Sequence, residues 1–500
     1  MPDSFIHGID VVEIDSGPRP ISTVRSAVIG LVGTAPDAAA AVAATLTSGN
    51  VAADTALVWT AVSDGAAGNT LRVILVDPGA ASQALAVAVS DTLITVRLAT
   101  DATAAITSTA ALVMAAVNAH AQAGLLVDVT ALSPSDGSGV LSAWPKQLSL
   151  AGGLDAALPL NTPVLVTTRS AAARFGTAGT IPAALDAIWD QNGAWVVVIR
   201  VTAGVDKAAT VTNLLGNSAT YTGVHGLLAA ETAVHVTPRL LIVPGYSDES
   251  TVVAELIGLA ERLRAVIIAD GPNSTDAAAI AYREEFGSDR VYLVDPQVQV
   301  WDSTTNAPTT QVASPRVAGL IAKSDTERGF WWSPSNQTIN GITGTARPID
   351  FQLGQADSAA NYLNENEVAT IIRQDGYRLW GNRSCASDPK WAFLSVRRTA
   401  DMIHESMIAA HLWAVDRNIT KTYVEDVLAG INAYLAHLQV LGAIIGGRAW
   451  ADPELNTPDQ IAQGKVYFDF DFSACYPAEH ITFRSHLVND YLVDLFKTAA

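Results

Sequence analysis

The sequence predicts a multidomain protein that combines α/β and α+β regions, and three observations support this fold class. At 500 residues, the chain is too long for one hydrophobic core. Between residues 158 and 296, apolar runs of strand length alternate with helical patterns, as in a mostly parallel sheet with helices on both faces. Residues 313–486 mix long amphipathic helices with alternating strands, which predicts an antiparallel α+β domain.

Composition limits the possible functions. Apolar residues make up 49% of the chain and charged residues 16%, so a large buried core is expected. The formal net charge of −19 disfavours direct nucleic-acid binding, which needs a basic face. Neither Cys385 nor Cys475 has a second cysteine or a histidine at metal-ligand spacing, so no metal site and no disulfide framework are expected.

No membrane insertion is expected either, although residues 427–447 carry no charge. Val427, Ile431 and Leu435 lie on one helical stripe, and Thr422 with Glu425 fits a capping box just ahead of it. We therefore predict a packed amphipathic helix. The N-terminus lacks a basic region followed by an apolar one, so no ordinary secretion signal is expected.

Alternating apolar residues at both ends of the chain predict extended arms. Residues 9–14 alternate, and Gly17-Pro18 ends the run before any local partner strand. Such a strand is expected to pair with the edge of another sheet, and pairing with neighbouring subunits would make it a connector. The residues expected in the arm strands are Ile9, Val11, Val12, Ile14, Ile481, Phe483 and Leu487.

A candidate for the receiving sheet lies near the C-terminus. Phe468, Phe470 and Phe472 alternate with Asp469 and Asp471, which predicts a strand with one apolar face and one wet face. The phenylalanine face is expected to receive the arms. The two carboxylates are interpreted as a solvated face rather than a cation site.

Residues 46–155 differ in composition from the rest and predict a small inserted outer domain. This part is rich in Ala, Thr, Val, Ser and Gly, and one helix is expected at 108–123. Its β-rich runs are 59–62, 70–76, 84–89 and 93–98.

The segments that flank this insertion, 21–45 and 156–312, predict the central α/β domain. Its expected strands are 164–168, 195–201, 240–243, 265–269 and 291–294, and its expected helices are 181–191, 224–233, 251–263 and 276–286.

The stretch 314–351 predicts the junction with the C-terminal domain. Ser314 suits a helix N-cap with Pro315 after it, and Gly329 ends the helix. Phe330, Trp331 and Trp332 follow and are expected to lock the two domains together. Beyond them we expect a helix at 359–373, strands at 377–380, 391–396 and 466–472, and helices at 399–415 and from 422.

Four stretches in order resemble the contractile-tail sheath proteins of phages and related injection machines: 7–38, 314–351, 375–403 and 446–472. The resemblance implies a subtilisin-like but non-catalytic central domain, flanked by an N-terminal arm at 1–20, a C-terminal core domain at 313–486 and a C-terminal arm at 487–500. It further implies stacked hexameric rings of the protein itself around a tail tube protein, with baseplate and tail terminator proteins as partners. The virion tail would be the final location, reached after assembly in the host cytoplasm, and no cofactor is implied.

The sequence lacks the motifs of the rival enzyme functions. Asp270-Gly271 and His225-Gly226 lack the neighbours of a protease triad, and neither a G-x-S-x-G elbow nor a phosphate-binding loop occurs. We therefore expect no enzyme. The alternatives are the sheath of a phage-tail-like bacteriocin or other contractile injection system, an α/β hydrolase with an unrecognised site, and a surface adhesin suggested by the β-rich insertion.

Overall fold

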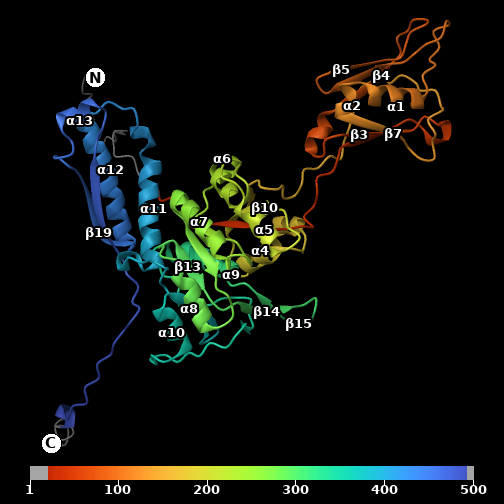
Figure 1. Ribbon diagram of the computed structural model, residues 1–500. Helices are drawn as coiled ribbons and strands as arrows, with labels where there is room; N and C mark the ends of the chain where they lie inside the picture. Colours follow the sequence, from red (N-terminus) through yellow and green to blue (C-terminus); the bar gives the residue numbers. More distant parts are fainter. Residues whose placement is uncertain (1–20, 493–500) are drawn as a thin grey trace, which may run out of the picture.

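An eight-stranded sheet forms the centre of the molecule, for which a computed structural model describes residues 21–492 (Figure 1). Its order is β18-β17-β13-β12-β11-β1-β10-β9. Strands from β10 to β17 are parallel, and the outer pairs β9–β10 and β17–β18 are antiparallel, which confirms the predicted mostly parallel sheet. The strands are β1 (Val28–Thr34), β9 (Val164–Val166), β10 (Trp195–Val201), β11 (Leu240–Ile242), β12 (Val266–Asp270), β13 (Val291–Val294), β17 (Val368–Arg373) and β18 (Tyr377–Trp380).

Helices cover both faces of this sheet. On one face α4 and α9 pack against Ile29, Val198 and Ile268, and on the other α7 and α8 pack against Leu241 and Ile267. Alternate residues of a strand point to opposite faces, so strands buried on both faces are apolar throughout. The helices are α3 (Arg169–Ala172), α4 (Thr180–Trp189), α5 (Lys207–Leu215), α6 (Ala230–Val234), α7 (Ser250–Leu263), α8 (Asp276–Glu284), α9 (Ser314–Arg328) and α10 (Ala359–Glu365).

The region after residue 313 differs from the expected domain boundary. Helix α9 belongs to the central core, and β17 and β18 extend the central sheet. The predicted helix at 359–373 is wrong beyond α10, because Glu367 adopts a left-handed φ of 52° and the run Val368–Arg373 continues as β17. A small sheet of β14 (Val298–Asp302), β15 (Ala307–Gln311) and β16 (Gly344–Thr345) lies beside this region.

Residues between β1 and β9 form a separate β-rich body at the end of a stalk (Figure 1). Its core includes Trp59, whose indole N–H donates to the Ser48 hydroxyl over 3.0 Å. Two sheets, β2-β3-β7 and β5-β6-β4-β8, enclose this core with α1. The elements are β2 (Thr45–Ser48), β3 (Leu57–Ala61), β4 (Arg72–Val76), β5 (Ala86–Ser90), β6 (Leu93–Arg97), α1 (Ala110–Ala119), α2 (Ala123–Leu126), β7 (Val127–Ala131) and β8 (Leu148–Ser149).

On the opposite side of the central sheet, α11 (Leu394–Ala410) and α12 (Lys421–Val440) form a layer with β19 (Ile444–Ala451) and β20 (Phe468–Ala474); α13 (Pro458–Ala462) lies between the two strands in sequence (Figure 1). The predicted strand at 391–396 is wrong, because α11 already begins at Leu394. The predicted capping box is also wrong, because Thr420 caps α12 by accepting from the Tyr423 N–H. The uncharged stretch 427–447 divides into the end of α12 and the start of β19, and none of the described helices could span a membrane.

Candidate assembly interface

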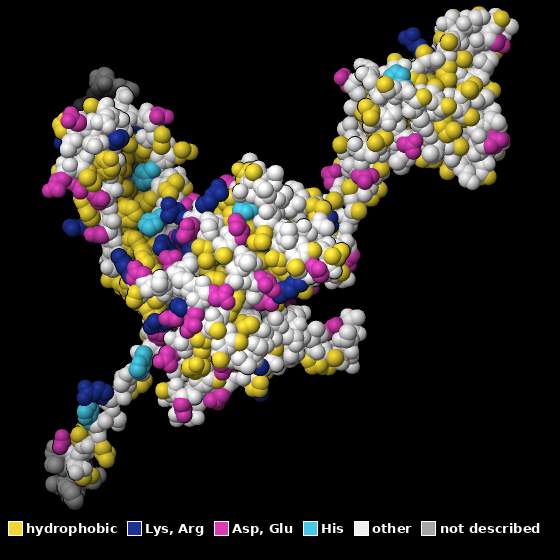
Figure 2. Space-filling view, in the orientation of Figure 1, with side chains coloured by type: hydrophobic (Ala, Val, Ile, Leu, Met, Phe, Trp, Pro, Cys, Tyr) yellow, Lys and Arg dark blue, Asp and Glu magenta, His cyan; other side chains and the backbone are white. Residues whose placement is uncertain are grey.

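The antiparallel pair β19–β20 forms a sheet of only two strands. Its register pairs Ala451 with Phe468, Ala449 with Phe470 and Gly447 with Phe472. The three phenylalanines pack on the cluster that α12 builds from its buried apolar stripe, yet each remains partly exposed. The structure thus brings the three predicted receiving residues together on one face. Figure 2 shows hydrophobic side chains gathered in a hollow over the α11–α12–β19 region.

The two edges of this small sheet differ. At the edge of β19, the Ala449 N–H donates to Asn432 Oδ1 over 2.8 Å, and Asn432 Nδ2 donates to the Ala449 carbonyl over 3.2 Å. Gln439 Nε2 also donates to the Ile445 carbonyl over 2.9 Å. Side chains of α12 therefore satisfy the backbone of β19. No described residue outside the ladder bonds to the backbone of Phe470 or Phe472.

Charged side chains fix α11 to the central part of the protein. Asp401 is buried and accepts from Arg290, with Nη1 2.7 Å from Oδ2 and Nη2 3.1 Å from Oδ1. Arg397 donates to the same carboxylate over 3.0 Å. One turn further on, Glu405 pairs with Arg239 and Arg264. Arg239, Arg264 and Arg290 lie just before strands β11, β12 and β13 of the central sheet, so paired charges join α11 to that sheet.

His404 projects from α11 toward β20. Its ring lies edge-on to Phe470 and Phe472, with centroid distances of 5.9 and 6.3 Å. Burial lowers the pKa of His404, and the nearby guanidinium groups of Arg264 and Arg397 lower it further. The imidazole is therefore expected to be neutral, and in this form it packs against the phenylalanine side chains of β20.

The chain enters this layer along α11 and α12. The Val24 N–H donates to the Ser406 hydroxyl over 3.1 Å, and the hydroxyls of Thr23 and Tyr434 lie 3.0 Å apart. Residues 21–26 are therefore attached to the α11–α12 pair before β1 begins. The predicted arm residues Ile9, Val11, Val12 and Ile14 lie outside the described residues.

The chain leaves the layer from an anchored point. Arg383 donates to both carboxylate oxygens of Glu479, over 2.8 and 2.6 Å, and Tyr476 contacts Phe393 with ring centroids 6.1 Å apart. Beyond Glu479 the chain runs away from the body, with Phe483 91% and Leu487 100% exposed (Figure 1). The extended segment therefore starts before the expected residue 487, and Ile481 is exposed as well.

The three aromatic residues predicted at the domain junction have different environments. Phe330 is 5% exposed and belongs to the cluster of α11 and α12, and Trp331 packs against it with ring centroids 5.1 Å apart. Trp332 is 51% exposed, and the Arg328 guanidinium lies 5.3 Å from its ring. Phe330 and Trp331 thus connect the end of α9 to the C-terminal layer, whereas Trp332 faces solvent.

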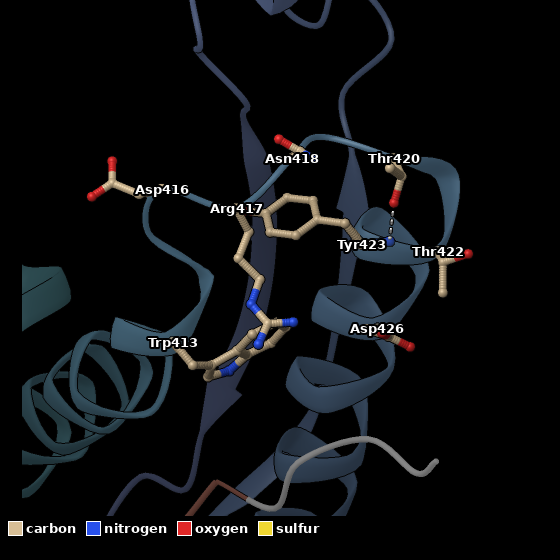
Figure 3. A pocket seen from close by; sticks show the side chains of 8 residues that line it. All are labelled: Trp413, Asp416, Arg417, Asn418, Thr420, Thr422, Tyr423 and Asp426. Carbon is tan, nitrogen blue, oxygen red and sulfur yellow. Dashed lines mark hydrogen bonds between the residues drawn. The ribbon is translucent and has the colours of Figure 1, made fainter.

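A surface hollow lies at the turn between α11 and α12 (Figure 3). The Arg417 guanidinium lies 5.2 Å from the Trp413 ring, and the Tyr423 ring contacts both Trp413 and Phe468, with centroid distances of 6.3 and 6.4 Å. The hollow therefore continues the aromatic face of β20. Asp426 lines its other side.

Residues that could suggest catalysis have structural roles. The Asp270 carboxylate is buried at the start of α9, where it accepts from the Ser314 N–H over 2.8 Å, the Ser314 hydroxyl and the Ser247 hydroxyl. The expectation that Ser314 caps α9 is thus wrong, because its hydroxyl bonds to Asp270. Burial raises the pKa of Asp270 to about 6. His225 pairs with Glu255, and residues 21–492 contain no group of His, Cys, Asp and Glu suited to a metal ion.

Comparison with known proteins identifies the family to which this chain is similar. Three family models match: the phage tail sheath protein central domain (residues 219–385), the phage tail sheath C-terminal domain (386–487) and the Gp18 domain III N-terminal region (147–201). A prophage major tail sheath protein of Pseudomonas aeruginosa is 46% identical over 69% of this chain and 91% of its own length. The tail sheath protein of Escherichia phage P2 is 37% identical over 67% and 88%, and that of Burkholderia phage BcepMu is 29% identical over 99% of both chains.

Solved structures share the fold at low sequence identity. The sheath of the anti-feeding prophage in its contracted helical state has a TM-score of 0.53 at 21% identity, over 66% of this chain and 89% of that one. A subunit of the anti-feeding prophage baseplate, solved with six-fold symmetry applied, has a TM-score of 0.51 at 19% identity, over 70% and 100%.

These matches define the class of protein: the chain belongs to the phage tail sheath family. It is a subunit of a contractile tail sheath, a structural component of a phage or phage-like particle and not an enzyme. Sequence patterns alone missed the polar joint at α11 and the side-chain cover on β19. The spacing of Arg397, Asp401 and Glu405 on one helix face was the only available signal.

Proposed function

We propose that this subunit polymerises as stacked hexameric rings around a tail tube, and that contraction of the sheath drives the tube through the envelope of the target cell for genome delivery. Baseplate and tail terminator proteins would bound the sheath at its two ends. The phage relative that matches over 99% of both chains supports delivery of a genome. No nucleic-acid contact by the sheath itself is part of the proposal, in keeping with the net charge of −19.

One observation carries the assembly mechanism. The two-stranded sheet β19–β20 has a partly exposed phenylalanine face, and the same chain ends in an extended segment with exposed apolar residues. Neither feature is favourable in a monomer, because a two-stranded sheet is marginal in water and an isolated strand buries too little to offset its ordering entropy. We infer that arms of neighbouring subunits complete this sheet, which keeps the subunits connected while they move.

We also propose that residues 46–155 are an outer domain that assembly does not need. The β-rich body has a core of its own, and its two sheets do not pair with the central sheet. The P2 and Pseudomonas relatives match over about nine tenths of their own length while covering little more than two thirds of this chain. Such coverage fits a shared sheath core with an additional part in this chain.

Electron microscopy of the purified protein tests the proposal. The full chain is expected to form tubes or rings, whereas variants that lack residues 1–16 or 480–500 are expected to stay monomeric with an unchanged melting temperature. The unchanged melting temperature shows that the deletion has not unfolded the subunit. Tubes of normal stability from both truncated variants would exclude assembly through the arms.

A further inference from the structure

We propose that the tip of the β14–β15 hairpin of one subunit inserts into a surface cleft at the end of α9 of a second copy, with Trp301 and Asp302 as its contact residues. This inference rests on the proposed stacked rings and goes beyond them, because it names a contact between folded parts of two subunits that involves neither terminal arm. Four features of the described residues support it: the shape of the hairpin, the position of the cleft, the lining of the cleft, and the charges of both.

The first feature is that the β14–β15 hairpin projects from the central domain (Figure 1). β16 pairs only with Val298 and Gln299 at its base, so within residues 21–492 no third strand covers its outer part. Trp301 lies in this outer part opposite Pro308 and is 52% exposed. Tryptophan is enriched among the residues that dominate interface energies, and proline at an edge disfavours addition of a further strand. The tip is therefore better fitted to enter a cavity than to extend a sheet.

The second feature is the position of the cleft, which has a volume of about 650 Å³. Its lining comes mainly from residues 23–28, where the chain enters β1, and from residues 325–331 at the end of α9. The hairpin ends just before α9 begins, so tip and cleft lie toward opposite ends of this 15-residue helix, which is about 22 Å long. Subunits that form a ring contact each other through two different surfaces. A projection and a cleft on opposite sides meet this requirement.

The third feature is the lining, which combines aromatic rings with guanidinium groups. The Arg25 guanidinium lies 3.9 Å from the centre of the Trp195 ring, and Trp331 packs edge-on against Phe330. Arg328 lines the cleft as well, and its Nε is buried without a hydrogen-bond partner among the described residues. Aromatic pairs and cation–π contacts both stabilise an indole ring in such surroundings. The cleft can therefore bind a tryptophan side chain.

The fourth feature is charge, and the cleft is positive. The charged residues that line it are Arg25, Asp325, Glu327 and Arg328. Arg398 neutralises Asp325, with Nη1 2.8 Å from Oδ1, whereas neither lining arginine forms a salt bridge with a described carboxylate. Glu327 is thus the remaining acid against two cations. A site of this charge attracts an acidic partner.

The hairpin supplies the matching negative charge. Asp302 is the only charged residue between positions 298 and 311. Because neighbouring side chains of a strand point to opposite faces, Asp302 and Trp301 would contact opposite sides of a cleft that encloses the tip. We therefore expect Trp301 to face Trp331 and Asp302 to face Arg25.

Charge disfavours the hollow at the α11–α12 turn as the site for the same tip. This hollow also combines an arginine, Arg417, with aromatic rings. Two acids, Asp416 and Asp426, line it as well. The carboxylate of an inserted Asp302 would meet like charges there, which weakens association.

Truncation of the ring tests the contact. Trp301→Ala is expected to raise the critical concentration for polymerisation at least about tenfold, which equals about 1.4 kcal/mol. Tyr362→Ala removes a similarly exposed ring from α10 and is the matched control, with an expected change of less than about twofold. Both changes should leave the melting temperature of the arm-truncated monomer unaltered, since neither ring is buried. A Trp301 variant that polymerises like the wild type would overturn the proposal.

Charge exchange tests the orientation of the tip. Asp302→Asn keeps an oxygen that can accept from the Thr304 N–H and removes only the charge, so it should raise the critical concentration about threefold. Asp302→Arg and Arg25→Asp each place like charges together, and each should raise it about fivefold. Their combination restores opposite charges and is expected to return to within about twofold of the wild type. A combination no better than the single variants would refute the pairing of Asp302 with Arg25.

Cross-linking tests the choice of cleft. In a Cys475→Ser background, Asp302→Cys with Arg25→Cys is expected to give a ladder of disulfide-linked oligomers in the assembled sheath, whereas Asp302→Cys with Arg417→Cys is not. A ladder from the second pair alone would overturn the assignment. If Trp301→Ala assembles normally while the variants lacking 1–16 or 480–500 do not, the hairpin contact fails and the proposed function stands. If the full chain forms neither tubes nor rings, both fail.

Discussion

The central sheet and the small sheet β19–β20 are built from similar apolar strands but differ in how their edges and faces are closed. The central sheet has helices on both faces, and antiparallel strands β9 and β18 form its two edges. The small sheet has helices on one face, one edge covered by α12 side chains and one edge that no residue of 21–492 covers. The first is therefore a complete folding core, whereas the second is the sheet that we propose is completed by assembly.

Asparagine side chains cover the backbone at the edges of two individual strands. In the β-rich body, Asn118 of α1 accepts from the Val129 N–H over 2.9 Å and donates to the Val129 carbonyl over 2.8 Å, which blocks the edge of β7. Asn432 of α12 blocks β19 in the same way at Ala449. Unprotected edges invite pairing with other chains. The free edge of β20 thus contrasts with two edges that the chain protects.

The largest expected effect concerns the charged joint between the two regions. Asp401→Ala would leave Arg290 and Arg397 buried without their carboxylate, which costs about 3–5 kcal/mol. Asp471→Ala removes an exposed pair with Arg448 and should cost less than about 1 kcal/mol. Urea unfolding of the arm-truncated monomer measures both. Equal losses would show that the joint does not contribute to monomer stability.

Among the aromatic residues at the domain junction, a stability loss of similar size is expected for Phe330 and not for Trp332. Phe330→Ala removes a buried ring from the cluster of α11 and α12 and should cost about 3–5 kcal/mol. Trp332→Ala, two residues away, removes a half-exposed ring and should leave the melting temperature nearly unchanged. Thermal unfolding distinguishes them, and similar shifts for the two variants would contradict the structure at this junction.

A carboxylate at the end of β12 in the central sheet predicts a pH effect on stability. Asp270 has a folded pKa of about 6 against 3.8 in the unfolded chain, so the folded state holds its proton more tightly. Its stabilising contribution is therefore present below about pH 4 and is lost as the pH rises through about 6. Relative to Asp270→Asn, the wild type should lose about 2 kcal/mol of unfolding free energy between pH 4 and pH 7. A pH-independent difference between the two proteins would refute this.

The smallest expected effect is that of removing the β-rich body. Because its core is separate from the central sheet, a variant with residues 46–155 replaced by a short Gly/Ser linker should fold and polymerise like the wild type. Sedimentation and electron microscopy measure the polymer. A folded variant that remains monomeric would place this body in the assembly core.

The strands of the central sheet could be predicted from the sequence, because burial on both faces makes them continuous apolar runs. Val291–Val294 was predicted at its observed bounds, and Trp195–Val201 likewise. The C-terminal region was less predictable. The start of α11 was taken for a strand, and β19 was missed because Gly446 and Gly447 interrupt its pattern. Tertiary contacts decide these elements more than local preference does.

The phenylalanine face was predictable from strict alternation, whereas the edges were not. Asn432 and Gln439 appear in the sequence as polar interruptions of an apolar helix, and their backbone partners on β19 become evident only in three dimensions. The same holds for Asp401, whose partners Arg290 and Arg397 lie 111 and 4 residues away. Sequence patterns report which face is buried, and they do not report which edge is closed.

The anchor at Arg383 and Glu479 sets a limit on movement. Since the chain is fixed at Glu479 and extended beyond it, the eight residues from there to Leu487, a predicted arm residue, can reach at most about 28 Å. A neighbour that holds the far end of this segment can turn and slide relative to the first subunit, but their separation cannot exceed that reach. The length of the tether would thus set the maximum stroke between adjacent subunits that remain linked.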